Sequence, residues 1–472
     1  MIRTIHKPGG MREMIAIAIP MVVAMACDTV MTFTDRVFLS RLGPEIMNAA
    51  LGGGIASFMI STFFTGLVGY STALVAQYLG AGRKNFCARV VAQALFIIAV
   101  GYPLIILCRP FAHFLFERSG ISFEQLIPQK LYFNILIFGS VIGLLRMSLS
   151  SFFSGIGRTR VVMIAAFASM VANIFFNYVL IYGKLGLPAM GIAGAAYGTI
   201  LGGCLGLIVL AAAYFRKNNR KEFSVAGSAR FDREVMYKLL RYGYPAGLEM
   251  FLKIFAFNAI VMLFQSHSAM TATAVSIMFN WDMVSFIPLI GIGIGVTSLV
   301  GRAMGSGRPE LAAASVISGL KLGSIYSAII LLLFVGLPDI LVGVFSPSAG
   351  DIGTFVEAAP LAIFMIRVAS LYVMVNAVII VFISALRGAG DTFWAMCLTV
   401  GVHWVIVASL FLMLNLSGAS PKSAWVVFTC VFIVFSFVVY ARYRGGKWRD
   451  IKLVAQKAVL QPSDYFHEQM EI

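Results

Sequence analysis

Two acidic residues lie in the first long apolar segment of the chain. Asp28 and Asp35 are seven positions apart, about two helical turns, so a helix would carry both on one face. An ionisable group inside a membrane span is costly and is by default a candidate for function. Both are therefore candidates for binding a coupling cation. For Asp28 the alternative is a structural pair with a neighbouring basic group.

Asn173 and Asn177 form a second polar group, one helical turn apart in the fifth apolar segment, so their amides share a face. Buried amides need hydrogen-bond partners, and a carboxylate in the first segment would supply an acceptor. We expect them to support the acidic residues. The alternative is that they only hold two helices together.

Charged residues also lie in apolar segments of the second half, among them Glu249, Lys253, Asp282 and Arg367. Lys253 could form a neutral structural pair with Asp282, or with Glu249 one turn before it. The alternative is a substrate cavity of positive character, which would favour anionic or zwitterionic cargo.

Motifs for covalent or metal chemistry are absent from the sequence. It contains no DDxxD, HExxH, GxSxG or phosphate-loop pattern, and its five histidines are dispersed. An intramembrane enzyme would need such a cluster. We therefore expect no enzyme, no catalytic residues, no metal site and no resident cofactor.

The segments that carry these residues are long and apolar. Of 472 residues, 60% are hydrophobic and 12% charged, about half the charged share of a soluble domain. A spanning helix needs roughly 20 mostly apolar residues. We predict an all-α polytopic membrane protein with twelve transmembrane helices, at about 14–39, 50–79, 90–108, 131–153, 161–183, 191–215, 242–265, 273–301, 313–337, 360–386, 394–415 and 423–441.

The basic residues predict orientation. The net charge of +16 gathers in short connections between spans, which indicates membrane topology rather than nucleic-acid binding. The positive-inside rule puts both termini in the cytoplasm of a multi-pass plasma (inner) membrane protein. We expect an N-terminal lobe at 1–215, a cytoplasmic linker at 216–241, a C-terminal lobe at 242–441 and a basic cytoplasmic tail at 442–472.

The two halves repeat one another in sequence. Pro20 and Pro245, Gly80 and Gly305, and Gly82 and Gly307 are each 225 positions apart. Gly-Ile-Gly-Arg-Thr (155–159) recurs as Gly-Ala-Gly-Asp-Thr (388–392), now 233 apart, so one small insertion explains the change. We expect two pseudo-symmetric six-helix bundles, related as parallel repeats, with the substrate pathway between them.

Several motifs together resemble the multidrug and toxic-compound extrusion (MATE) family. They are Phe-Thr-Asp-Arg (33–36) after Pro20, Leu-Val-Ala-Gln-Tyr-Leu-Gly-Ala-Gly-Arg (74–83), Phe-Phe-Ser-Gly-Ile-Gly-Arg-Thr-Arg (152–160), Asn-Ile-Phe-Phe-Asn-Tyr (173–178), Met-Gly-Ile-Ala-Gly-Ala-Ala-Tyr-Gly-Thr (190–199), Leu-Val-Gly-Arg-Ala-Met-Gly-Ser-Gly (299–307) and Leu-Arg-Gly-Ala-Gly-Asp-Thr (386–392). The resemblance covers about residues 11 to 441.

The resemblance implies an antiporter that exports organic small molecules in exchange for protons, or sodium, by alternating access between two lobes. It implies that Asp35 is the cation-linked aspartate and that Asn173 and Asn177 lie beside it. Where a sodium-linked branch of the family has acidic residues in spans seven and ten, this sequence has Lys253 and Asn376, so protons are the expected coupling ion.

The expected partners are a small organic substrate and the lipid bilayer, without nucleic acid, and we expect a monomer. A lipid-linked oligosaccharide flippase of similar architecture is the alternative function. It would need a wider lumen with more basic residues lining it.

Overall fold

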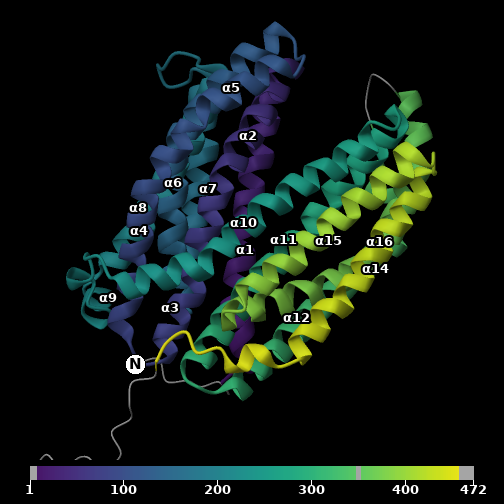
Figure 1. Cartoon of the computed structure of the whole chain (residues 1–472). Helices are drawn as coiled ribbons and strands as arrows, with labels where there is room; N and C mark the ends of the chain where they lie inside the picture. The colour runs from purple at the N-terminus through teal and green to yellow at the C-terminus, as the bar shows by residue number, and fades with distance from the viewer. Residues whose placement is uncertain (1–7, 347–351, 456–472) are drawn as a thin grey trace, which may run out of the picture.

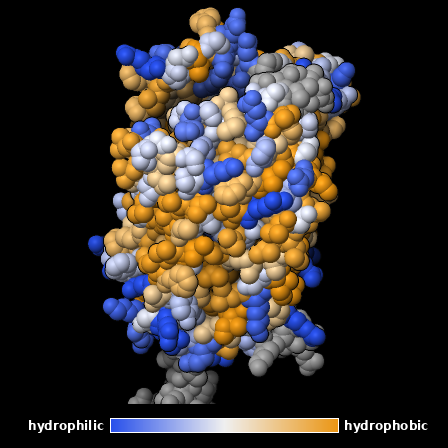
Figure 2. Space-filling view, turned by 90° about the vertical axis from the view of Figure 1, so that its right-hand side faces the viewer, coloured by the Kyte–Doolittle hydropathy of each residue, from blue (hydrophilic) through white to orange (hydrophobic). Residues whose placement is uncertain are grey.

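The computed structural model of the chain describes residues 8–346 and 352–455, and nearly all of these residues are helical. Twelve helical stretches among them are long and apolar enough to cross a membrane. This confirms the predicted all-α polytopic class. Side chains of high hydropathy cover the middle of the molecular surface, and polar side chains gather toward its two ends (Figure 2).

The first six candidate spans form one bundle, on the left of Figure 1. Its helices are α1 (Met11–Ser40), α2 (Pro44–Gly69) continued by α3 (Ser71–Gly80), α4 (Lys84–Leu107) continued by α5 (Arg109–Arg118), α6 (Phe123–Gly155), α7 (Thr159–Tyr182) and α8 (Gly191–Phe215). The short α9 (Lys217–Glu222) and a 3-10 turn (Val225–Gly227) then connect this bundle to the next.

The last six candidate spans form the second bundle. Its helices are α10 (Arg233–Gln265), α11 (Ala269–Gly305), α12 (Pro309–Gly336), the short α13 (Pro338–Gly343), α14 (Ile352–Ala389), α15 (Thr392–Phe411) with a π-helical turn (Leu412–Leu416), and α16 (Pro421–Arg444). Helix α10 begins at Arg233, inside the segment expected to be linker, because the Asp232 side chain caps it by accepting from the Val235 amide at 3.2 Å.

The two bundles meet at one end of the molecule and diverge toward the other (Figure 1). They meet at the end that carries the start of α1, α9 and the basic connections. We call this contact zone the inner seam; it comprises the N-terminal parts of α1 and α10, the C-terminal part of α2, α3, and the C-terminal part of α11.

The contacts across the inner seam are reciprocal. A Cβ atom on Gly80 would lie 2.0 Å from the carbonyl oxygen of Arg302, and one on Gly305 would lie 2.0 Å from that of Gln77. Gly80 and Gly305 are 225 positions apart, and so are Gln77 and Arg302. Each half therefore makes the same close helix crossing onto the other. Two polar contacts add to it, because Gln77 donates to the Gly388 carbonyl at 2.8 Å and Arg302 pairs with Glu13.

The N-terminal parts of α1 and α10 each pack in the opposite bundle. Met14 and Ala18 of α1 belong to the apolar core of the second bundle. Val235 and Leu239 of α10 belong to the core of the first. Pro20 and Pro245 lie just after these exchanged segments. Both helices thus cross between the bundles close to a proline, which removes one backbone hydrogen bond and eases bending.

The repeated Gly-x-Gly motifs form the turns at this same end. In each motif the first glycine packs closely. Gly80 and Gly305 form the contacts across the inner seam described above. A Cβ atom on Gly155 would lie 2.7 Å from the carbonyl oxygen of Thr72, and one on Gly388 would lie 2.7 Å from that of Thr297. The second glycine (82, 157, 307 and 390) has a φ between 66° and 102°, a left-handed conformation that favours glycine. The sequence repeat is therefore a repeat of helix-ending turns.

Candidate functional site

Asp35 lies on α1 among polar side chains from α7 and α8. Its carboxylate accepts a hydrogen bond from Asn177 Nδ2, and its Oδ2 lies 3.3 Å from Thr199 Oγ1. Asn173 donates to Thr199 Oγ1 at 3.4 Å and accepts from Asn177 at 3.3 Å. We call these four residues the Asp35 cluster. The structure thus brings Asp35, Asn173 and Asn177 together as the sequence predicted.

Glycines on α8 make this close arrangement possible. Gly194, Gly198 and Gly202 recur every four residues, so they form a stripe on one face of the helix that lets α7 approach closely. A Cβ on Gly198 would lie 2.0 Å from Asn177 Oδ1, and one on Gly202 would lie 2.8 Å from Asn173 Cβ. The stripe therefore determines how near the two asparagines come to Asp35.

One acceptor in the Asp35 cluster has no donor. Both asparagines are fully buried, and Asn177 Oδ1 has no hydrogen-bond partner among the described residues. A buried carbonyl oxygen without a donor is unfavourable. The cluster is thus short of one hydrogen-bond donor at this oxygen, which lies against Gly198.

The chemistry of the Asp35 cluster suits a monovalent cation. It presents one carboxylate together with neutral amide and hydroxyl oxygens, whereas divalent ions such as Ca²⁺ take six to eight oxygen ligands, often with several carboxylates. No group of three or more His, Cys, Asp or Glu side chains suited to a metal occurs in the part of the chain that the structure describes. These oxygen atoms could bind either a proton or a sodium ion.

Asp28 lies outside the Asp35 cluster, although it shares a face of α1 with Asp35. Its Oδ1 lies 3.6 Å from Nη2 of Arg146 on α6. This corresponds to the structural alternative considered for Asp28. Thr199, by contrast, was not predicted from the sequence. The one available signal was its place in the motif that ends at residue 199.

The charged residues of the second bundle pair differently from the two expected arrangements. Glu249 forms an ion pair with Arg387 of α14, and Asp282 accepts a hydrogen bond from Tyr372 of the same helix. Lys253 has no ion-pair partner among the described residues; its Nζ lies 6.0 Å from the ring centre of Phe286. The structure therefore does not bring Lys253 into a pair with either acidic residue.

Two further predicted positions lie on α14. Asn376 is buried, whereas Arg367 lies on an exposed face of the helix. Neither residue contacts the Asp35 cluster, which belongs to the first bundle.

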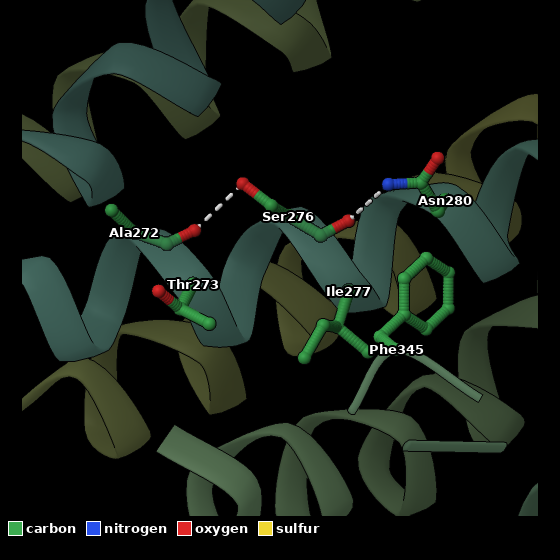
Figure 3. A pocket seen from close by; sticks show the side chains of 6 residues that line it. All are labelled: Ala272, Thr273, Ser276, Ile277, Asn280 and Phe345. Carbon is green, nitrogen blue, oxygen red and sulfur yellow. Dashed lines mark hydrogen bonds between the residues drawn. The ribbon is translucent and has the colours of Figure 1, made fainter. Parts of the chain in front are cut away.

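A separate pocket of about 350 Å³ lies beside the N-terminal part of α11 (Figure 3). It contains no charged side chain, and its polar groups already serve the helix backbone. Ser276 donates to the Ala272 carbonyl and Asn280 to the Ser276 carbonyl, each at 2.7 Å. These groups offer little to a charged cargo, so we assign no binding role to this pocket.

Taken together, two six-helix bundles that meet at one end, with an uneven distribution of intramembrane charge, define a polytopic membrane transporter of the two-lobe class. The sequence model of the MatE family matches residues 20–179 and 245–413. The chain therefore belongs to the MatE family, whose members are transporters and not enzymes. The two matched segments begin 225 positions apart, the same spacing as the repeat.

Similar proteins include the probable multidrug resistance protein NorM of Mesorhizobium japonicum, 28% identical over 414 residues, which cover 83% of this chain and 86% of that protein. Multidrug resistance protein PmpM of Pseudomonas aeruginosa is 26% identical over 429 residues, covering 88% and 87%.

Solved structures share the fold. One, described as an outward-facing conformation of a multidrug resistance MATE family transporter of the MOP superfamily, has a TM-score of 0.84 at 19% identity and covers 93% of this chain and 96% of that chain. Another is a MOP superfamily transporter from Pyrococcus furiosus, with a TM-score of 0.83 at 19% identity and the same coverage.

Proposed function

We propose that the protein exports small organic molecules across the plasma membrane in exchange for protons, with Asp35 as the residue that binds the coupling ion. The observation that carries this proposal is the Asp35 cluster: a carboxylate in a membrane span that accepts hydrogen bonds from the buried Asn177 and from Thr199, both of which also bond to the buried Asn173. Relatives across most of the chain are named as multidrug resistance proteins, which supports organic substrates.

The Asp35 cluster can hold a proton as the coupling ion. A protonated Asp35 carboxyl can donate to Thr199 Oγ1, which lies 3.3 Å from Oδ2. Lys253 and Asn376 stand where a sodium-linked branch of the family has further acidic residues, and this favours protons over sodium. Sodium remains the alternative coupling ion, because the same oxygens could ligate it.

Alternating access is the proposed mechanism. The reciprocal contacts of the inner seam support a state closed at that end, and the divergence of the bundles supports access from the other. Basic residues concentrate at the seam end, so we propose that this end, with both termini and the 216–241 linker, faces the cytoplasm. The lobes would be residues 1–215 and 242–441, with a tail at 442–472.

The flippase alternative is not favoured. A lipid-linked oligosaccharide carries an anionic diphosphate. The lumen of a flippase for this substrate would therefore need several basic side chains in each lobe. In the first bundle Arg146 is already paired with Asp28. The relatives are also named as multidrug resistance proteins and not as lipid transporters.

Transport in proteoliposomes under separate gradients tests the coupling ion. The probes are rhodamine 110, which has a free carboxyl group, and rhodamine 123, its methyl ester. A difference of about one pH unit should drive up to about tenfold accumulation for one-for-one exchange without a membrane potential, because a tenfold ratio corresponds to about 1.4 kcal/mol. A sodium gradient at equal pH should give background levels. Sodium-driven accumulation alone would contradict proton coupling, and no accumulation under either gradient would contradict antiport.

Cysteine labelling tests the orientation. Ala229 in the linker and Ser119 after α5 are both exposed, at opposite ends of the molecule. In a variant without native cysteines, an impermeant maleimide applied to intact cells should label Ser119→Cys strongly and Ala229→Cys only after permeabilisation. The reverse pattern would show that the proposed orientation is wrong.

A further inference from the structure

We propose that Lys253 binds a carboxylate group of the cargo, so that the protein transports organic acids and zwitterions with an aromatic body. This inference rests on the proposed transport function and extends it to a substrate class. Lys253 has no counter-ion among the described residues of the protein.

The first step is the charge balance around Lys253. Glu249 lies one turn before it on α10 and forms an ion pair with Arg387, which neutralises both. The other carboxylate on the neighbouring helix, Asp282, accepts a hydrogen bond from Tyr372. No acidic side chain among the described residues lies within 4.0 Å of the Lys253 ammonium group, and the group formed by Glu249, Arg387 and Lys253 keeps one net positive charge.

The internal repeat explains why this charge is unpaired. Lys253 corresponds to Asp28, 225 positions earlier, and Asp28 pairs with Arg146 of α6. In α14, which corresponds to α6 with a separation of 233, the position equivalent to Arg146 is Ile379, a buried apolar residue. The second bundle therefore has an uncharged side chain at the position where the first bundle has Arg146, the ion-pair partner of Asp28.

Lys253 also lies on the face of α10 that is turned toward the first bundle. Ala246 on this face contacts α2 at the inner seam, where its carbonyl oxygen would lie 2.7 Å from a Cβ on Gly66. Lys253 follows Ala246 by seven residues, two helical turns, so it lies on the same face about 10 Å farther from the seam. There the bundles diverge (Figure 1), and Lys253 is only partly buried.

The surroundings suit an aromatic acid. The ring of Phe286 on α11 flanks the ammonium group, with its centre 6.0 Å from Lys253 Nζ. An uncompensated cation in a membrane span is costly. A carboxylate from the cargo would supply the missing counter-charge, while the Phe286 ring packs against its apolar body.

The test compares rhodamine 110 with its methyl ester, rhodamine 123, because the two dyes differ only in the carboxylate. Binding to the purified protein in detergent is measured by fluorescence anisotropy, so the result does not depend on ion coupling. Wild type should bind rhodamine 110 at least about tenfold more tightly than the ester, a difference of about 1.4 kcal/mol. Lys253→Gln should abolish this preference and leave binding of the ester unchanged, and Lys253→Arg should retain it.

Lys321→Gln is the matched control, because it removes a lysine from the exposed surface of α12 in the same bundle; it should keep the preference. Equal binding of the two dyes by wild type, or equal loss of both in Lys253→Gln, would overturn the inference. If the preference holds but neither dye accumulates in proteoliposomes, then the antiport proposal fails and the carboxylate site remains.

Discussion

Replacing Asp35 with asparagine is expected to abolish accumulation of substrate against its gradient, while the protein still folds and inserts. Asparagine has nearly the same shape as aspartate; its Oδ1 can accept from Asn177 Nδ2 and its Nδ2 can donate to Thr199 Oγ1, so the Asp35 cluster can keep both contacts. It cannot bind a proton at neutral pH. Accumulation in proteoliposomes should therefore fall from about tenfold to background, while downhill exchange of substrate persists.

Proton release gives a second measurement for this variant. If substrate and proton compete, adding substrate to wild type in weakly buffered detergent, at a pH at which Asp35 is protonated, should release about one proton per substrate bound, detected with a pH dye, and Asp35→Asn should release none. Asp282→Asn is the control, because Tyr372 can still donate to the new side chain. Proton-driven accumulation by Asp35→Asn, or the same loss in Asp282→Asn, would refute the assignment of coupling to the first bundle.

Alanine at Gly80 or Gly305 is expected to weaken the inner seam by similar amounts. A Cβ at either position would lie 2.0 Å from a backbone carbonyl oxygen of the other bundle, so the helices must move apart. Overpacking of this kind costs about 1–3 kcal/mol, a shift of roughly 5- to 150-fold away from the state closed at this end. Each variant should have a lower melting temperature in detergent. A cysteine at Ala303, buried in this zone, should react faster with maleimide.

Gly143→Ala is the control for both seam variants. Gly143 lies in helix α6, and nothing lies within 4 Å of a Cβ added there. Alanine should be neutral or stabilising by up to about 1 kcal/mol, because it favours the helix. Unchanged melting and labelling in both seam variants would show that these close contacts do not hold the bundles together.

Much of the fold could be predicted from the sequence because its signals are local. Twelve apolar segments of sufficient length predict the spans, and the repeated glycines mark turns that occur in both halves. The helix period and the need of buried amides for partners indicated that Asn173 and Asn177 share a face and need an acceptor. That they lie beside Asp35 was implied by the family resemblance. Apart from this resemblance, each of these inferences depends on residues that are near in sequence, or on a repeat.

Pairing between helices could not be predicted in the same way. Thr199 joins the Asp35 cluster only because glycines of α8 let α7 approach closely, and one threonine in an apolar helix carries no signal of that. The predicted span at 360–386 ends just before Arg387, which puts this residue in a connection. Helix α14 extends to Ala389, however, and the Arg387 side chain pairs with the buried Glu249. The choice of partner there depends on helix rotation and depth, which the sequence does not encode locally.

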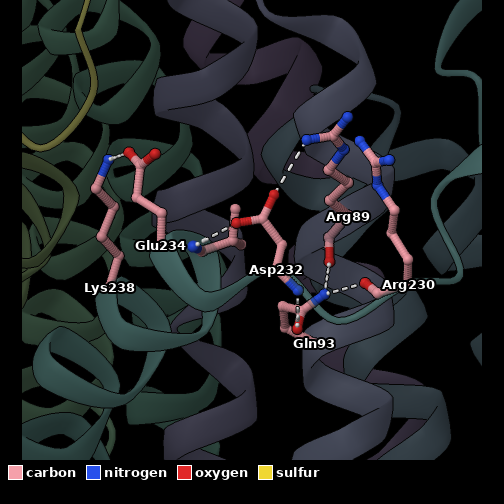
Figure 4. Close-up of polar contacts among 7 residues, drawn as sticks. Arg89, Gln93, Arg230, Asp232, Glu234 and Lys238 are labelled. Carbon is pink, nitrogen blue, oxygen red and sulfur yellow. Dashed lines mark hydrogen bonds and ion pairs between the residues drawn. The ribbon is translucent and has the colours of Figure 1, made fainter.

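The connection between the bundles is firmly attached to the first of them. Burial disfavours the charged form of Glu222, yet hydrogen bonds from Lys84, at 2.9 Å, and Arg158 hold the pKa of Glu222 below its ordinary value. Arg89 pairs with Asp232 at 3.0 Å, and Gln93 bonds both the Arg230 carbonyl and the Asp232 amide (Figure 4).

The segment from Lys217 to Asp232 therefore cannot act as a flexible linker that allows the two bundles to move independently. It would travel with the first bundle, together with the start of α10, whose Val235 and Leu239 are held in that bundle's core. Any rocking of the second bundle must then be taken up inside α10, near Pro245, and its counterpart inside α1 near Pro20. Alternating access would then depend on bending within two helices that cross between the bundles, and not on a flexible linker.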